Sequence, residues 1–411
     1  MDDITSIMYP RTIQTALAEA LNDTPVVLLN GARQTGKSTL VQALHPGIRY
    51  LTLDDTAVLA AAKADPFGFI AAFNEPVCLD EVQRVPELFL AIKAAVDKQR
   101  TPGRFLLTGS ANVLMLPQMA DSLAGRMEII ELWPLAQSEL NRHTGSVIDR
   151  LFAGDFARYY PFERTDFIAR LIAGGYPEAM QRTNERRLSA WFDSYLATIL
   201  QRDVKTLANI EGLTELPKLV RLLAVRSGGL LNFAELARST GIPQTTLKRY
   251  MVLLETLFLI RQVPAWSSHL GKRLQKSPKL FLSDYGLMAH LQGLNAVQMT
   301  QAHGLPGDLV EAFVHAELAK HQTWAERSTQ FMHYRTSTGI EVDFVLENRR
   351  QELLGVEVKA AATVVGKDFK GLRHLRETAP TQFKRGVLLY TGEQVVDFDE
   401  QLTAVPIALL L

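Results

Sequence analysis

The segment from Gly31 to Ser38 has the sequence Gly-Ala-Arg-Gln-Thr-Gly-Lys-Ser, which fits the spacing G-x-x-x-x-G-K-[ST]. Glycines let a loop wrap its backbone N–H groups around phosphates, and the N-terminus of a following helix adds a favourable dipole. An apolar stretch at 26–30 precedes the loop, and an apolar-periodic segment at 39–43 follows it. We therefore predict a phosphate-binding loop in which Lys37 offers charge to the outer phosphates and Ser38 ligates Mg²⁺.

Two carboxylates, Asp80 and Glu81, follow a second apolar stretch at residues 77–79. A carboxylate pair at a strand end is the usual second half of such a site. We predict that Asp80 holds Mg²⁺ through water and that Glu81 polarises the attacking water. The residues predicted to bind the nucleotide are Gly31, Ala32, Arg33, Gln34, Thr35, Gly36, Lys37, Ser38, Thr39 and Asp80.

A third apolar stretch ends in small polar residues that would lie between these two loops. Thr108, Ser110 and Asn112 compete for sensing the terminal phosphate, with a slight preference for Ser110; the alternative is an ordinary polar turn. Arg126 is predicted to act as an arginine finger on the nucleotide of a neighbouring subunit, and Arg84 is a weaker candidate. The alternative for Arg126 is a surface arginine.

Further carboxylates lie in the C-terminal part of the chain. Asp343 and Glu357 belong to two apolar stretches about one hairpin apart, and Lys359 shares the face of Glu357 because strand side chains alternate. Two carboxylates with a main-chain oxygen suit Mg²⁺, and Glu311 offers another carboxylate from a preceding helix. We predict a metal site here. The alternatives are the same fold kept for DNA binding or assembly without cleavage, and a structural charge cluster.

The segment 216–285 is strongly basic, with 11 Lys/Arg against three Asp/Glu. A short amphipathic segment, a Gly-containing turn and a longer amphipathic segment form a helix-turn-helix pattern. Two extended stretches follow, with a basic segment between them, which resembles a winged helix with a basic wing tip. We predict DNA binding, and the alternative is a structural or protein-docking module. The predicted DNA contacts are Gln244, Thr245, Thr246, Lys248, Arg249, Lys272, Arg273 and Lys276.

Composition narrows the class of protein. The chain has 411 residues with 44 Lys/Arg and 44 Asp/Glu, so the rest of the chain must balance the basic segment. A hydrophobic content of 47% is ordinary for a globular protein. A single cysteine excludes an internal disulfide and a cysteine-based zinc site. No apolar run approaches the roughly 20 residues of a membrane span, and the start lacks a basic signal, so we expect a cytoplasmic protein with no membrane partner.

The elements that must position these residues follow from hydrophobic spacing. Short apolar stretches alternate with helical patterns between residues 25 and 135, which predicts an α/β domain with a parallel sheet. The predicted strands there are residues 26–30, 49–53, 76–79, 104–108 and 127–132. The predicted domains are residues 1–135 with an N-terminal helix at 9–22, a helical segment at 136–215, the basic domain at 216–285, a loose linker at 286–306, and a second α/β domain at 307–411.

Several of these stretches together resemble an AAA-type group of prokaryotic P-loop ATPases whose chains end in a nuclease-like domain. They are the phosphate loop, Leu-Asp-Glu-Val-Gln-Arg-Val-Pro at 79–86, Leu-Thr-Gly-Ser at 107–110, Leu-Ala-Gly-Arg at 123–126 with Pro-Leu at 134–135, Gly-Gly-Tyr-Pro-Glu at 174–178 and Arg-Asp at 202–203. The resemblance covers nearly the whole chain. It implies ATP and Mg²⁺ as cofactors, an extra strand between the two nucleotide motifs, a helical lid at 136–215, and assembly into a homo-oligomer such as a hexameric ring.

The C-terminal spacing D-x₁₃-E-x-K with an upstream glutamate resembles the PD-(D/E)xK nuclease fold, which includes resolvases of four-way junctions. Val342 stands where a proline usually precedes the aspartate. The expected fold class is therefore α/β: a P-loop AAA-type ATPase core with a helical lid, a winged-helix domain, and a C-terminal restriction-endonuclease-like α/β domain.

The function expected from these features is ATP hydrolysis coupled to the binding and remodelling of DNA, duplex or branched, by a homo-oligomer. The residues expected to act in hydrolysis are Lys37, Glu81, Ser110 and Arg126. One alternative is an ATP-gated, Mg²⁺-dependent nuclease that uses the C-terminal carboxylates. The other is a nucleotide-dependent switch that docks proteins.

Overall fold

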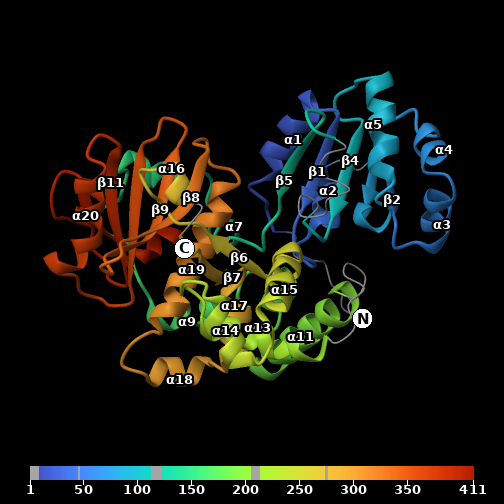
Figure 1. Ribbon diagram of the computed structural model, residues 1–411. Coiled ribbons are helices and arrows are strands. Elements are labelled where there is room, and N and C mark those ends of the chain that lie inside the picture. Colours follow the sequence, from blue (N-terminus) through green and yellow to red (C-terminus); the bar gives the residue numbers. More distant parts are fainter. Residues whose placement is uncertain (1–8, 45–46, 113–122, 205–212, 274–275) are drawn as a thin grey trace. The chain divides into compact units, whose positions relative to one another are not determined.

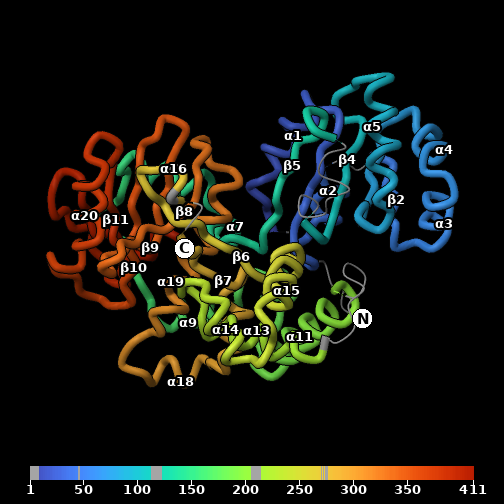
Figure 2. Tube along the Cα trace, in the orientation of Figure 1, coloured from blue at the N-terminus to red at the C-terminus, as the bar shows by residue number. Residues whose placement is uncertain are grey.

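The computed structural model describes two compact units, each with its own sheet and its own buried core (Figure 1; Figure 2). The first unit is Met1–Leu135 with Thr256–Phe258, and the second is Ala136–Glu255 with Leu259–Leu411. The described residues are 9–44, 47–112, 123–204, 213–273 and 276–411.

The first unit contains a five-stranded sheet in the order β2-β3-β4-β1-β5, with every pair parallel. The strands β1, β3 and β4 are buried along their whole length, as expected for a parallel sheet covered by helices. The strands are β1 (Val26–Asn30), β2 (Arg49–Thr52), β3 (Val77–Asp80), β4 (Phe105–Gly109) and β5 (Met127–Glu131). The helices are α1 (Gln14–Asp23), α2 (Lys37–Leu44), α3 (Thr56–Ala64), α4 (Pro66–Ala71) and α5 (Leu88–Lys98), with a 3₁₀ turn η1 (Val82–Arg84).

The predicted α/β domain with a parallel sheet is confirmed, and each of the five strands begins and ends within one residue of its expected limits. Strand β4 lies between β1 and β3, so one further strand separates the phosphate loop from the carboxylate pair. The predicted helix at 9–22 was wrong at its start, because α1 begins only at Gln14. Pro10 disfavours a helical conformation at Tyr9, and the Arg11 side chain is bound to backbone carbonyls elsewhere in the unit.

The second unit begins with helices and ends with a mixed six-stranded sheet. Its helices are α7 (Gln137–Leu140), α8 (Val147–Ala153), α9 (Arg164–Ala173), α10 (Pro177–Met180), α11 (Glu185–Thr198), α13 (Leu216–Val225), α14 (Phe233–Thr240), α15 (Gln244–Thr256), α16 (Leu270–Arg273), α17 (Tyr285–Gln292), α18 (Ala296–Gln301), α19 (Gly307–Gln322) and α20 (Lys370–Thr378). Shorter turns are the π-helix η3 (Ile199–Asp203) and the 3₁₀ turns η4 (Leu213–Glu215), η5 (Gly366–Phe369) and η6 (Ile407–Leu410).

The strands of this unit form a hairpin and a larger sheet. The hairpin pairs β6 (Ile260–Val263) with β7 (Lys279–Leu282). The sheet has the order β12-β13-β11-β10-β9-β8, in which β8, β9 and β10 are antiparallel and β10, β11 and β13 are parallel. Its strands are β8 (Thr329–Arg335), β9 (Glu341–Asn348), β10 (Leu353–Lys359), β11 (Phe383–Tyr390), β12 (Val396–Asp397) and β13 (Leu402–Pro406). Helix α20 joins the parallel pair β10 and β11, and it packs on both strands.

The predicted loose linker at 286–306 was wrong, because α17 and α18 occupy it. Asp284 caps α17 by accepting the N–H of Leu287 at 2.9 Å, and Gly293 ends that helix in a left-handed conformation. Asn295 then caps α18. The glycine and the polar residues that resembled a linker are therefore helix-terminating residues.

Candidate functional site

The predicted phosphate loop lies between β1 and α2, at the carboxyl end of the parallel sheet. Gly31 fits only as glycine, since a Cβ there would lie 2.1 Å from the carbonyl oxygen of Leu132. Lys37 is buried, and its Nζ donates to the carbonyl oxygens of Gly31 at 2.9 Å and Ala32 at 2.8 Å. The ammonium therefore bends back over the loop. The predicted residues from Gly31 to Gly36 form this loop, and Lys37, Ser38 and Thr39 form the first turn of α2.

Arg11 holds the loop from outside, and the sequence interpretation missed it. Its guanidinium donates from Nη1 to the carbonyl oxygen of Thr35 and from Nη2 to that of Trp133, both at 2.7 Å. These partners lie 24 and 122 positions away in the chain, so no local spacing pointed to this contact. The two bonds fix the loop just before Gly36 and Lys37.

Asp80 ends β3 beside Ser38, and the Ser38 hydroxyl donates to Asp80 Oδ1 at 3.4 Å. The hydroxyl of Thr108, near the tip of β4, donates to the same Asp80 oxygen. Tyr50 on β2 also hydrogen-bonds to Ser38 and Asp80, and burial raises the pKa of its phenol. Three hydroxyl groups thus surround one buried carboxylate.

Glu81 follows in a left-handed backbone conformation, with φ at 60°. Ser110 Oγ donates to Glu81 Oε2 at 2.7 Å, and the side-chain amide of Gln83 donates both to that oxygen and to Ser110 Oγ. The backbone N–H of Glu81 donates to the hydroxyl of Thr108 at 3.3 Å. The structure therefore brings Ser110 to Glu81 and Thr108 to Asp80. Gln83, which lies inside the segment 79–86, was not singled out from the sequence.

These side chains fit the chemistry of a nucleotide with Mg²⁺. The Ser38 hydroxyl and the Asp80 carboxylate are oxygen ligands of the kind that Mg²⁺ prefers, and they lie within hydrogen-bonding distance of one another. Mg²⁺ supplies charge neutralisation at the phosphates in sites of this class. Lys37 can move from the loop carbonyls to phosphate oxygens, and the Glu81 carboxylate is the group available to orient and deprotonate water.

The two arginine candidates are paired with aspartates, and Arg126 lies away from these groups. Arg126 precedes β5 at the amino end of the sheet, and its Nε donates to Asp97 Oδ1 on α5 at 2.5 Å. The phosphate loop follows the carboxyl end of the neighbouring strand β1, about 16 Å away along a five-residue strand. Arg84 pairs with Asp54. Neither guanidinium is placed beside the phosphate loop of its own chain by these contacts.

The predicted helix-turn-helix consists of α14 and α15. Along α15, Leu247, Tyr250, Met251 and Leu254 are buried, so the apolar face packs inward. The polar residues at its start face outward: Gln244, Thr245, Lys248 and Arg249 are exposed, and Thr246 is partly exposed.

In the predicted basic wing, two of the cations have partners within the unit. Arg273 pairs with Glu347 on β9 through both terminal nitrogens, at 2.5 and 3.2 Å, and both side chains are largely buried. Lys276 donates to the carbonyl oxygen of Arg335 at 2.8 Å. The side chain of Lys272 lies outside the described residues. Arg273 is therefore engaged by the C-terminal sheet, whereas Lys276 stays exposed.

At the predicted C-terminal metal site, the structure adds a lysine that the sequence interpretation did not include. Asp343 and Glu357 do lie side by side on β9 and β10, but the ammonium of Lys279 lies between Asp343 and Glu311. Lys359 binds Asp368 at 2.6 Å instead of the carboxylate cluster. Among the described residues, no group of three or more His, Cys, Asp or Glu has the arrangement of a metal site.

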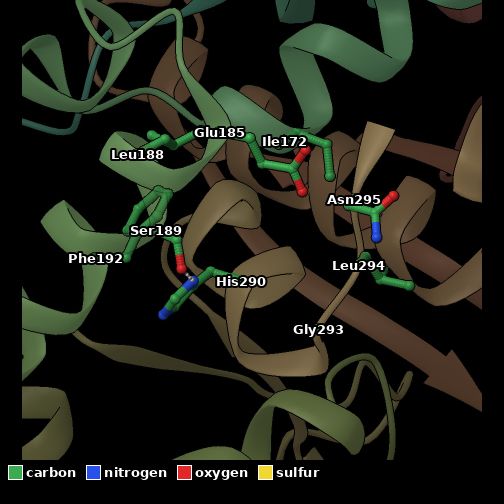
Figure 3. Close-up of a pocket in the computed structure, with 9 residues that line it drawn as sticks. All are labelled: Ile172, Glu185, Leu188, Ser189, Phe192, His290, Gly293, Leu294 and Asn295. Carbon is green, nitrogen blue, oxygen red and sulfur yellow. Dashed lines mark hydrogen bonds between the residues drawn. The ribbon is translucent and has the colours of Figure 1, made fainter. Parts of the chain in front are cut away.

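A pocket of about 180 Å³ in the second unit contains none of the predicted site residues (Figure 3). His290 links its walls, with Nδ1 at 3.3 Å from Ser189 Oγ and Nε2 at 3.0 Å from Asp193 Oδ1. The imidazole also stacks on Phe192. The pocket lining is Ile172, Glu185, Leu188, Ser189, Phe192, His290, Gly293, Leu294 and Asn295. These contacts give His290 a structural role between α11 and α17.

Comparison with protein families assigns a class to the first unit. An AAA domain model matches residues 23–141, which include the phosphate loop and the carboxylate pair. Two domains of unknown function match residues 164–298 (DUF8612) and 306–410 (DUF4143). The chain is thus an AAA-type P-loop ATPase that uses ATP and Mg²⁺.

The particular family follows from the relatives. The chain is 30% identical to the uncharacterized proteins Rv2008c of Mycobacterium tuberculosis and Mb2031c of Mycobacterium bovis, over 95% of its own length and 82% of theirs. It belongs to the same family as these two mycobacterial proteins. An uncharacterized protein of Haemophilus influenzae is 23% identical over 65% of this chain and 69% of its own.

Two solved structures are similar at lower levels. The Walker-type ATPase paby2304 of Pyrococcus abyssi is 15% identical, with a TM-score of 0.43 over 69% of this chain and 96% of its own. The RuvB Holliday junction branch migration motor of Thermotoga maritima is 20% identical, with a TM-score of 0.29 over 61% of this chain and 89% of its own. In the described parts of the chain, no helix combines the length and apolarity that crossing a membrane requires.

Proposed function

We propose that this ATPase binds DNA through its basic segment and couples ATP hydrolysis to remodelling of, or movement on, duplex or branched DNA. The observation that carries this proposal is the outward-facing start of α15. Gln244, Thr245, Lys248 and Arg249 are exposed there, although the rest of the helix is anchored by buried apolar residues. Amides, hydroxyls and cations at the start of a helix are the groups that contact bases and phosphates in helix-turn-helix proteins.

The order of elements around α15 supports a winged-helix domain. Helices α13, α14 and α15 are followed by the antiparallel hairpin β6–β7, and Leu230 adds an antiparallel bridge to Lys279. The wing itself packs on the C-terminal sheet. The DNA proposal therefore rests on α15, and Arg273, which pairs with Glu347, is left out of the proposed surface.

Assembly of identical subunits is proposed from the placement of Arg126. Arg126 lies at the amino end of the sheet, whereas the phosphate loop of the same chain lies at the carboxyl end. It can therefore reach a nucleotide only on another subunit. In the isolated chain it pairs with Asp97, whose side chain is about half exposed, so little free energy opposes its release. A homo-oligomer, such as a ring, would let Arg126 act as an arginine finger.

A nuclease is the second candidate, favoured by the C-terminal sheet. The antiparallel strands β8–β9–β10, the crossover helix α20 and the parallel strand β11 place Asp343 beside Glu357, as the restriction-endonuclease-like fold requires. The fold supports kinship with nucleases and, through it, branched DNA as the proposed substrate. Cleavage needs a metal at these carboxylates, which Lys279 opposes.

The DNA proposal is tested by equilibrium binding of labelled duplex and four-way junction at several salt concentrations. For Lys248→Ala combined with Arg249→Ala we expect weaker binding of every sequence and a salt slope reduced by about one to two units. Arg186→Ala with Arg187→Ala is the matched control, because it removes two exposed cations from α11. Equal losses in both double variants, or salt-independent binding, would refute the assignment of α15.

A further inference from the structure

Lys279 begins β7 and is almost entirely buried, with 3% of the residue exposed. Its Nζ lies 2.8 Å from Glu311 Oε1 on α19 and 3.0 Å from Asp343 Oδ1 on β9. The other Asp343 oxygen accepts the backbone N–H of Val358 at 3.0 Å, and Glu357 hydrogen-bonds to Asp343. One ammonium therefore lies among three carboxyl groups drawn from three elements.

The acidic groups around Lys279 favour its charged form. Burial, and then the charge of Asp343, raise the pKa of Glu311 to about 8 and that of Glu357 well above its usual range, although Lys279 acts in the opposite direction. Burial alone would lower the pKa of Lys279, but Asp343 and Glu311 raise it above its ordinary value. Attraction to these two carboxyl groups therefore outweighs the cost of burying the Lys279 ammonium.

The residues present do not fit a resident Mg²⁺ in this cluster. Mg²⁺ needs carboxylate oxygens at about 2.1 Å in a nearly octahedral arrangement. The Lys279 ammonium already donates to two of the carboxyl groups, and two cations in one buried space repel strongly. Lys359, which would assist a metal-bound water, is held by Asp368.

We propose that Lys279 is the resident cation of this nuclease-like carboxylate site, so that the C-terminal domain binds no divalent metal while β7 stays in place. The same contact joins the β6–β7 hairpin to α19 and β9. Lys279 thus occupies the carboxylates that a nuclease would use for its metal, and metal-dependent cleavage would require Lys279 to leave this position. This inference concerns the carboxylate cluster alone and does not depend on DNA binding by α15.

The test is a count of Mn²⁺ ions bound to the full chain without nucleotide, measured by electron paramagnetic resonance. Wild type and Asp343→Asn should bind the same number. Lys279→Met should gain one Mn²⁺ per chain, and Asp343→Asn in that background should remove it. Lys359→Met is the matched control, since Lys359 also pairs with a carboxylate, that of Asp368, and its loss should gain no ion.

Two results would overturn the proposal. One is a Mn²⁺ ion on the wild-type chain that Asp343→Asn removes, which would mean that a metal displaces the lysine. The other is a folded Lys279→Met chain that gains no ion. If that variant does not fold, Lys279→Gln, which removes the charge but keeps a polar side chain and all three carboxyl groups, is judged by the same gain. The wild-type comparison with Asp343→Asn needs no lysine variant at all.

Discussion

Replacing Arg11 by alanine tests how the phosphate loop is held in shape. The guanidinium makes two hydrogen bonds of 2.7 Å, to the carbonyl oxygens of Thr35 and Trp133. Hydrogen bonds from a charged donor contribute about 1.5–3 kcal/mol each, so the pair contributes about 3–6 kcal/mol before water replaces part of it. We take about 1.5–3 kcal/mol as the net free energy by which Arg11 stabilises the ATP-binding shape of the loop. Losing it decreases the affinity for ATP about 10- to 100-fold.

The assay is equilibrium titration with a fluorescent ATP analogue, together with steady-state turnover. For Arg11→Ala we expect KM to rise far more than kcat falls, because Arg11 orders the loop without touching the reacting atoms. Arg11→Lys should recover part of the affinity. Arg100→Ala is the matched control, since Arg100 also donates to a backbone carbonyl, that of Gly125, away from the loop. Unchanged affinity in Arg11→Ala, or an equal loss in Arg100→Ala, would refute this explanation.

Three further variants test other contacts of the two units. Glu81→Gln should lower ATP turnover by about 10²- to 10⁴-fold while ATP still binds, and unchanged turnover would remove Glu81 from the role of base. Asp284→Ala leaves the N–H groups of Gly175 and Leu287 without their buried acceptor. The free energy of unfolding, measured by thermal denaturation, should therefore decrease by about 2–5 kcal/mol, and Asp284→Asn should recover part of it. Burial lowers the pKa of His321 to about 3, and its Nδ1 accepts the N–H of Val147. Between about pH 6.5 and pH 3 only the unfolded chain takes up this proton, so the free energy of unfolding should fall as pH decreases in this range, by up to about 1.4 kcal/mol per pH unit. A His321→Gln variant with an unchanged slope would contradict this.

The nucleotide site could be predicted from the sequence largely because its signals are local. The phosphate loop and the carboxylate pair each adjoin a short apolar strand, and both strands belong to one parallel sheet, whose carboxyl ends meet. The contacts that complete the site come from far along the chain. Arginine and glutamine are common surface residues, so the sequence does not distinguish Arg11 or Gln83. Only the fold shows which carbonyl or carboxylate each of them contacts.

The second unit was harder to predict because its charges are paired over long distances. Arg273 and Glu347 are 74 positions apart, and Lys279 and Asp343 are 64 positions apart. A net positive segment therefore predicted a DNA-binding wing, although two of its cations balance carboxylates of the C-terminal sheet. The error at 286–306 has another cause, since Gly293 and Asn295 are as common at helix ends as in linkers.

ATP turnover with Mg²⁺ is the measurement that tests the proposed function most directly, made without DNA and with single strands, duplex and a four-way junction. The same reactions should be resolved on a gel. We expect at least one DNA form to raise turnover, no DNA to be cut, and the stimulation to disappear in the Lys248→Ala, Arg249→Ala variant. Turnover that responds to no DNA form would contradict the account and favour a nucleotide-dependent protein-docking switch.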